Sequence, residues 1–199
     1  MNEQITTSVE QVVSRKTSVV LIGKSHAAPP RIVFPGSFNP LHTGHRKIAS
    51  IAKTIIGSPV CYEISIDNVD KPSMRAIDVV RRVNQFNENE TVAITRSKTF
   101  DKKGLLFPGA VFAVGVDTLT RIGNTKYYDT TGEYSPKKRM QLAIDQIAQL
   151  GCRLLVFGRK IDGNFCSLKD IVIPPSLRQL CQEVPEQMFR EDIASSDLR

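Results

Sequence analysis

A Gly-containing turn between an apolar strand and an amphipathic helix constrains this chain more than any other feature. Residues 32–35, with the sequence IVFP, form a short apolar run that predicts a buried strand. After the turn, residues 46–56 place four apolar side chains on one helical face: Ile48, Ile51, Ala52 and Ile55. A turn leading from a strand into a helix presents backbone N–H groups and the positive end of the helix dipole to an anion. The sequence therefore predicts an anion site at residues 36–45.

Two of the three histidines of the chain lie in this turn. His42 and His45 are three residues apart at the start of the predicted helix, so they share a face and can reach one ligand. Gly44 between them keeps side-chain bulk away from that ligand. A metal site would need a third ligand, and none follows at a recognisable spacing. Ordinary surface histidines would leave the glycines and the Asn-Pro turn unexplained, so a phosphate chain is the better ligand and no metal site is predicted.

The stretch GSFNPLHTGH at residues 36–45 resembles the signature of the HxGH nucleotidyltransferases. That superfamily includes nicotinamide and nicotinate mononucleotide adenylyltransferases, phosphopantetheine adenylyltransferase and cytidylyltransferases. Its members transfer a nucleoside monophosphate from ATP or CTP to a phosphate or similar acceptor and release pyrophosphate. The resemblance covers roughly residues 31–199.

The resemblance implies roles for six residues of this stretch and its helix. His42 and His45 would act on the phosphates, with His45 nearest the reacting α-phosphate. Backbone contacts to the nucleotide and an assisting cation are implied for the remaining four: Gly36, Ser37, Phe38 and Lys47.

Two later positions also resemble nucleotide-site elements of the family. The apolar run 111–114 leads into Gly115 and Asp117, where the resemblance implies that the glycine permits close backbone approach and the carboxylate accepts hydrogen bonds from ribose. An Asp that caps the following helix is the alternative. Arg159, after the apolar run 153–157, resembles a nucleotide-contacting arginine, and a solvated loop charge is the alternative.

The final residues, 192–199, have the sequence DIASSDLR and partly resemble the second family motif. In that motif small hydroxyls, backbone amides and an arginine bind the triphosphate, which implies that Ser196 and Arg199 grip the β- and γ-phosphates. Ala194 and Asp197 depart from the usual residues. A carboxylate at the end of the given chain would offset part of the charge of Arg199.

Composition excludes several classes of protein. An apolar content of 41% and a charged content of 24% are ordinary for a globular domain, and no run of eighteen apolar residues predicts a membrane span. We find no signal-peptide pattern, and the four cysteines are scattered, so we expect free thiols in the cytoplasm. The net charge of +7 is dispersed and lacks an aromatic RNA-binding pattern, which argues against nucleic acid and fits an anionic small substrate.

Alternating strands and helices predict an α/β fold of the Rossmann-like, doubly wound type, with a mostly parallel sheet and helices on both faces. Residues 1–30 are expected to be an N-terminal extension and residues 31–199 the nucleotidyltransferase domain. Ligands of such folds bind at the carboxyl ends of strands, so the predicted site residues should surround one crevice. Residues 97–108 are expected to cover the core, and residues 161–188 to be loop-rich with a short helix near 177–182.

The predicted reaction is transfer of AMP from ATP to nicotinamide or nicotinate mononucleotide, with Mg²⁺ arriving with the triphosphate. A cytidylyltransferase acting on a small phosphorylated alcohol is the alternative enzyme. A catalytically weak nucleotide-binding or regulatory protein is the alternative from another class. The sequence leaves the acceptor and the oligomeric state open, a homo-oligomer included.

Overall fold

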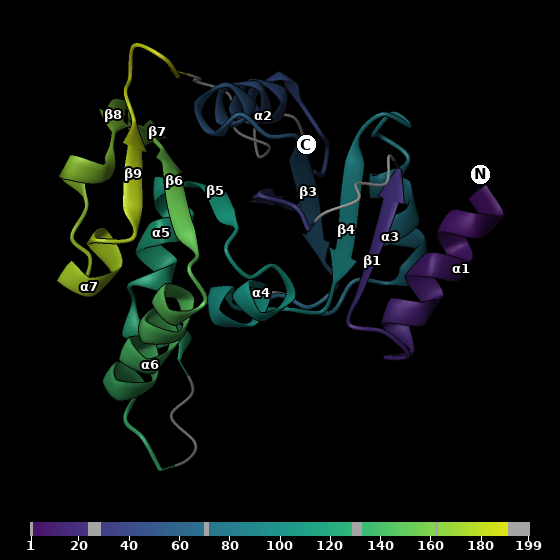
Figure 1. The fold of residues 1–199 in the computed structure, drawn as a ribbon, viewed down its shortest axis with the longest axis horizontal. Coiled ribbons are helices and arrows are strands. Elements are labelled where there is room, and N and C mark those ends of the chain that lie inside the picture. Colours follow the sequence, from purple (N-terminus) through teal and green to yellow (C-terminus); the bar gives the residue numbers. More distant parts are fainter. Residues whose placement is uncertain (1, 24–28, 70–71, 129–132, 162, 191–199) are drawn as a thin grey trace. The chain divides into compact units, whose positions relative to one another are not determined.

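The structure is a computed structural model that describes residues 2–23, 29–69, 72–128, 133–161 and 163–190 (Figure 1). The chain divides into two compact units, the first reaching Lys98 and the second beginning at Thr99. The predicted Rossmann-like α/β fold is confirmed, since helices alternate with strands that are mostly parallel. Within the described ranges, no helix has both the length and the apolar character needed to cross a membrane.

The first unit contains four strands in the order β1-β4-β3-β2, and β1 is the antiparallel edge strand. Because the crossovers from β2 to β3 and from β3 to β4 run in the same direction, their right-handedness puts α2 and α3 on one face. The elements, in chain order, are α1 (Asn2–Val13), β1 (Val19–Gly23), β2 (Ile32–Pro35), α2 (Thr43–Ile56), β3 (Val60–Ser65), α3 (Ala76–Val83) and β4 (Thr91–Thr95).

Residues ahead of the signature are built into this unit. Three apolar side chains of α1 are buried, namely Ile5, Val9 and Val12. Helix α1 packs against α3 and β1, as the right side of Figure 1 shows. Strand β1 lies antiparallel to β4, with Val19 opposite Thr95. Residues 2–23 of the expected N-terminal extension thus contribute a helix and an edge strand to this unit.

The second unit has three parallel strands in the order β5-β6-β9 and a separate antiparallel hairpin of β7 and β8. Helix α6 begins at Pro136, because the Ser135 hydroxyl accepts from the Lys138 N–H and proline suits the first turn of a helix. The elements are α4 (Phe100–Leu106), β5 (Val111–Gly115), α5 (Val116–Ile122), η1 (Thr125–Tyr127), α6 (Pro136–Gln149), β6 (Arg153–Phe157), β7 (Arg159–Ile161), β8 (Asn164–Cys166), η2 (Leu168–Asp170), α7 (Pro175–Arg178) and β9 (Cys181–Val184).

Two parts of the second unit have more regular structure than the sequence analysis describes. Residues 100–106, within the segment expected to cover the core, form helix α4. The helix expected near 177–182 ends at Arg178, and residues 181–184 form strand β9, parallel to β6. The pairing with β6, which is distant in sequence, decides this second case.

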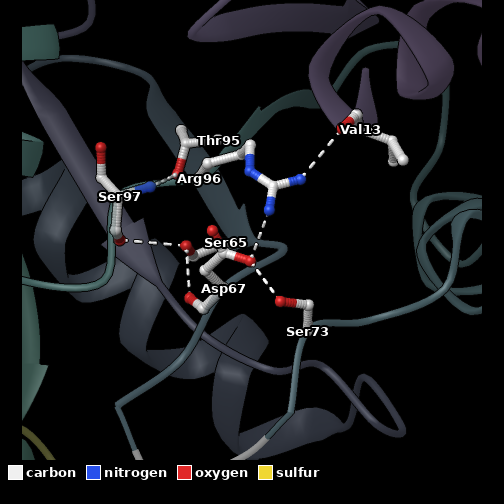
Figure 2. A network of polar contacts seen from close by, with 7 residues as sticks. All are labelled: Val13, Ser65, Asp67, Ser73, Thr95, Arg96 and Ser97. Atoms are coloured by element: carbon white, nitrogen blue, oxygen red, sulfur yellow. Dashed lines mark hydrogen bonds and ion pairs between the residues drawn. The ribbon is translucent and has the colours of Figure 1, made fainter. Parts of the chain in front are cut away.

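A network of polar contacts joins α1 to the loops that follow β3 and β4 (Figure 2). The Arg96 guanidinium donates to the Val13 carbonyl at 3.1 Å and to the Asp67 carboxylate at 2.9 Å. Asp67 is buried, and its Oδ1 also accepts from the Ser73 hydroxyl at 2.6 Å. The Ser65 hydroxyl donates to the Asp67 carbonyl at 2.7 Å. A single arginine thus satisfies a buried carboxylate and the end of a helix.

We expect Arg96→Ala to lower the free energy of unfolding by about 2–4 kcal/mol, because it leaves the buried Asp67 carboxylate without its cation. Urea unfolding measures the change. The matched control is Arg190→Ala, which removes an exposed ion pair with Glu186 and should cost less than about 1 kcal/mol. Equal losses in the two variants would contradict a special role for the network.

Candidate functional site

The turn before α2 is organised around the Phe38 ring. That ring is completely buried, and it packs edge-on against Phe34, Tyr62 and Phe86 at centroid distances of 5.5, 5.5 and 5.4 Å. A Cβ added to Gly36 would lie 2.6 Å from the Phe38 ring, so only glycine fits there. Phe38 has a φ of 45°, a left-handed conformation that is uncommon for a bulky residue. Packing of the ring therefore fixes an unusual backbone turn.

Hydrogen bonds occupy part of the backbone of this turn. The Gly36 N–H donates to the Glu63 carbonyl at 2.9 Å. The Ser37 carbonyl accepts from the Arg82 guanidinium at 2.9 Å, and the Phe38 carbonyl accepts from the Gln85 amide at 2.8 Å. Within the described ranges, the N–H groups of Ser37 and Phe38 have no hydrogen-bond partner. These two N–H groups are therefore available as donors to a ligand.

The two signature histidines lie against each other at the start of α2. Their ring centroids are 3.7 Å apart with an interplanar angle of 31°. The His42 backbone N–H donates to His45 Nδ1 at 3.2 Å, so Nδ1 is an acceptor and the proton of the neutral ring resides on Nε2. The structure brings these two predicted residues together and assigns the tautomer of one of them.

The environment of His45 keeps its ring neutral. The ring packs against Phe34 and Phe38 at centroid distances of 5.9 and 5.0 Å. Burial, followed by the electrostatic effect of the neighbouring His42, lowers the pKa of His45 to about 4. At neutral pH His45 can therefore donate a hydrogen bond from Nε2 without carrying a charge.

Helix α2 begins with cationic rather than acidic side chains. Its first turn contains no Asp or Glu, although acidic residues are the ones that stabilise a helix N-terminus. Arg46 forms an ion pair with Glu90. Burial and, after it, the nearby Glu90 carboxylate raise the pKa of Tyr62 to about 12. An open hollow lies over this end of the helix and is lined by Leu41, His42, Thr43, Arg46, Lys47 and Ser50. The helix start therefore carries no acidic side chain that would repel an anion.

The other described site residues belong to the second unit. Gly115 precedes α5 as its N-cap residue, and a Cβ added there would meet no described atom within 4 Å. Asp117 lies in the first turn of α5, and the N-cap position is held by Gly115 instead. The Asp117 carboxylate accepts from the Arg159 guanidinium, and each side chain is 40% exposed. The structure thus pairs two residues that the sequence predicts separately.

Some predictions lie beyond these observations. Ser196 and Arg199 lie outside the described residues, and the gathering of all site residues around one crevice stays a prediction. Among the described residues, no three His, Cys, Asp or Glu side chains form a group that could hold a metal ion. Sequence reasoning missed Arg82 and Gln85, which bind the turn from more than forty residues away and carry no local signal.

We expect the Cε1 proton of His45 to titrate in an NMR experiment with a midpoint near pH 4, compared with about 6.5 for an unperturbed histidine. Because the lowered pKa belongs to the folded state, the unfolded chain binds more protons between these two values. Stability should therefore fall as the pH decreases from about 6.5 to 4, and His45→Gln should lack this component. A midpoint near 6.5 would contradict the buried, neutral ring.

Comparison with known proteins agrees with the signature and the fold. A comparison with curated proteins gives no match. A cytidylyltransferase-like family model matches residues 33–199, a range that includes the whole signature, the first unit from residue 33 onward and all of the second unit. The resemblance to the HxGH nucleotidyltransferases is thereby confirmed. The chain belongs to the cytidylyltransferase-like family and carries the nucleotidyltransferase domain of that family.

Proposed function

We propose that this nucleotidyltransferase transfers AMP from ATP to nicotinamide or nicotinate mononucleotide and releases pyrophosphate. The observation that carries the phosphate-transfer chemistry is the tautomer of His45. Its Nδ1 accepts from the His42 N–H, which leaves a neutral Nε2–H as a fixed donor at the start of α2. The choice of adenylyl group and acceptor rests on the resemblance of the Gly-x-Asp step and of residues 192–199 to mononucleotide adenylyltransferases.

The reaction needs no protein nucleophile. An oxygen of the acceptor phosphate attacks the α-phosphorus in line, a new P–O bond forms, and the bond to the bridging oxygen breaks as pyrophosphate leaves. Catalysis then consists of positioning and of stabilising charge on the phosphate oxygens. His45 Nε2–H donates to an α-phosphate oxygen in the transition state, while the Ser37 and Phe38 N–H groups and the α2 dipole bind the nucleotide.

Magnesium fits this chemistry as a companion of the triphosphate. Residues 36–47 contain no carboxylate, so this stretch offers no hard anionic oxygen for the ion. Oxygen atoms of the triphosphate and water would hold it, as is usual for Mg²⁺. When bound, the ion neutralises phosphate charge.

Cytidylyl transfer to a small phosphorylated alcohol is the second candidate. The description of the matching family favours it, because that family is named for its likeness to cytidylyltransferases. The described residues of the signature act on phosphates, which ATP and CTP share, so they do not distinguish the two bases. Direct comparison of the two nucleotides decides between these functions.

The first experiment measures pyrophosphate release from ATP and from CTP with Mg²⁺. Acceptors are nicotinamide mononucleotide, nicotinate mononucleotide and a panel of phosphorylated alcohols. We expect release with ATP and one mononucleotide, and we expect His45→Ala to lower kcat about 100- to 1,000-fold while weakening ATP binding much less. The histidine control is His26→Ala, which changes the one histidine outside the signature and should retain activity.

Three other outcomes are informative. Release from CTP alone would support the second candidate. Equal losses of kcat and ATP affinity in His45→Ala would contradict a transition-state role for this ring. ATP binding without release for any acceptor would exclude both proposed reactions for the acceptors tried and favour a non-catalytic nucleotide binder.

We further propose that Asp117 accepts hydrogen bonds from the ribose of the nucleotide. We expect Asp117→Asn to weaken ATP binding about tenfold, because a charged acceptor is replaced by a neutral amide. The 2′-deoxy and 3′-deoxy forms of ATP serve as controls in titration calorimetry. The loss should be smaller for the form that lacks the bound hydroxyl. An equal loss for all three nucleotides would place the effect of Asp117 elsewhere, for example in its pairing with Arg159.

A further inference from the structure

We propose that Gln85 is a positioning residue for the nucleotide site, holding the signature turn by both of its ends. The inference rests on the proposed function for its kinetic consequences, but its structural part can be measured without any turnover. Gln85 lies just beyond the end of α3, outside the signature and more than forty residues from it in sequence.

One side-chain amide makes both contacts. Gln85 Nε2 donates to the Phe38 carbonyl at 2.8 Å, and Gln85 Oε1 accepts from the Leu41 N–H at 2.8 Å. These two backbone groups lie at the two ends of the turn formed by residues 38–41. A primary amide supplies a donor and an acceptor from adjacent atoms, which a carboxylate, an ammonium or an apolar side chain of similar size does not.

Gln85 is itself held in place by its surroundings. Its backbone N–H donates to the Arg82 carbonyl at 3.3 Å, and its own carbonyl accepts from the Arg46 guanidinium at 3.4 Å. The next residue, Phe86, packs its ring against Phe38 at 5.4 Å and against Tyr62 at 4.7 Å. The backbone of Gln85 is therefore held in place, and its side chain is half-buried.

The turn needs such support because its backbone is not intrinsically favoured. Phe38 has a φ of 45°, and conformations of this kind persist only where the surroundings hold them. Leu41 directly precedes His42, whose N–H sets the tautomer of His45. A loss of the amide would thus displace the Ser37 and Phe38 N–H groups at one end of the turn and His45 at the other.

The test compares wild type with Gln85→Ala and Gln85→Glu. Gln85→Ala removes both bonds, while Gln85→Glu keeps the size and the acceptor for Leu41 but sets a carboxylate oxygen against the Phe38 carbonyl. With the nucleotide and acceptor that release pyrophosphate, we expect kcat to fall about tenfold to hundredfold in both variants. The KM for the nucleotide should change less than about threefold, because the displaced groups matter most in the transition state.

A matched control separates positioning from loss of stability. Gln141 on α6, in the second unit, uses its Nε2 to donate to Asp145 at 2.7 Å and to Ser176 at 3.1 Å. Gln141→Glu is the same chemical change and removes the same kind of donor. We expect its kcat to stay within about twofold of wild type even where its melting temperature falls as far as that of Gln85→Glu.

Amide hydrogen exchange tests the contacts independently of catalysis. The Leu41 amide should exchange at least about tenfold faster in Gln85→Ala than in wild type, but should stay slow in Gln85→Glu, which keeps its acceptor. If wild type releases no pyrophosphate with any substrate pair, the proposed function fails, and the exchange of Leu41 still decides whether Gln85 holds the turn. Unchanged Leu41 exchange in Gln85→Ala, or a kcat within twofold of wild type in an active enzyme, would overturn the proposal.

Discussion

Burial of the Phe38 ring beneath a residue without a side chain is the packing constraint on which the site of the first unit depends. The ring fills the space that any Cβ at Gly36 would enter, and its aromatic neighbours come from β2, β3 and the segment after α3. A buried aromatic ring contributes a large apolar area and so stabilises the left-handed backbone that holds it. Packing in the core therefore fixes the backbone of the turn, whose Ser37 and Phe38 N–H groups have no partner among the described residues.

Electrostatics at the start of α2 follow from the same packing. Aromatic rings from the core surround one edge of His45, so the protonated form of that ring is disfavoured twice, by burial and by the neighbouring His42. A positively charged imidazolium would attract a phosphate group more strongly than a neutral ring does. The cationic side chains at the helix start are Lys47 and Arg46, the second of which is paired with Glu90, while His45 is a neutral donor with a fixed direction. Charge and direction are thus provided by different residues.

Local sequence patterns predicted the strand, the Gly turn and the helix of the signature because each depends on neighbouring residues. Strand β9 escaped prediction because its mixed sequence, CQEV, becomes a strand only through pairing with β6. Helix α4 escaped because Gly104 suggests a turn, whereas in the fold it permits close approach: a Cβ there would lie 3.0 Å from Leu150. The contacts of Gln85 could not be predicted either, since its two hydrogen bonds join segments that are distant in the chain.

The pairing of Asp117 with Arg159 bears on how a nucleotide could use either residue. Each side chain is 40% exposed, and an ion pair of that exposure is worth at most about 1 kcal/mol. A hydrogen bond to a charged group contributes about 1.5–3 kcal/mol. A ribose hydroxyl that bonds to the carboxylate would therefore offset the loss of the pair, and Asp117 has oxygens enough to bond to both partners at once. If Asp117 binds the nucleotide as proposed, the contact with Arg159 would orient its carboxylate instead of blocking it.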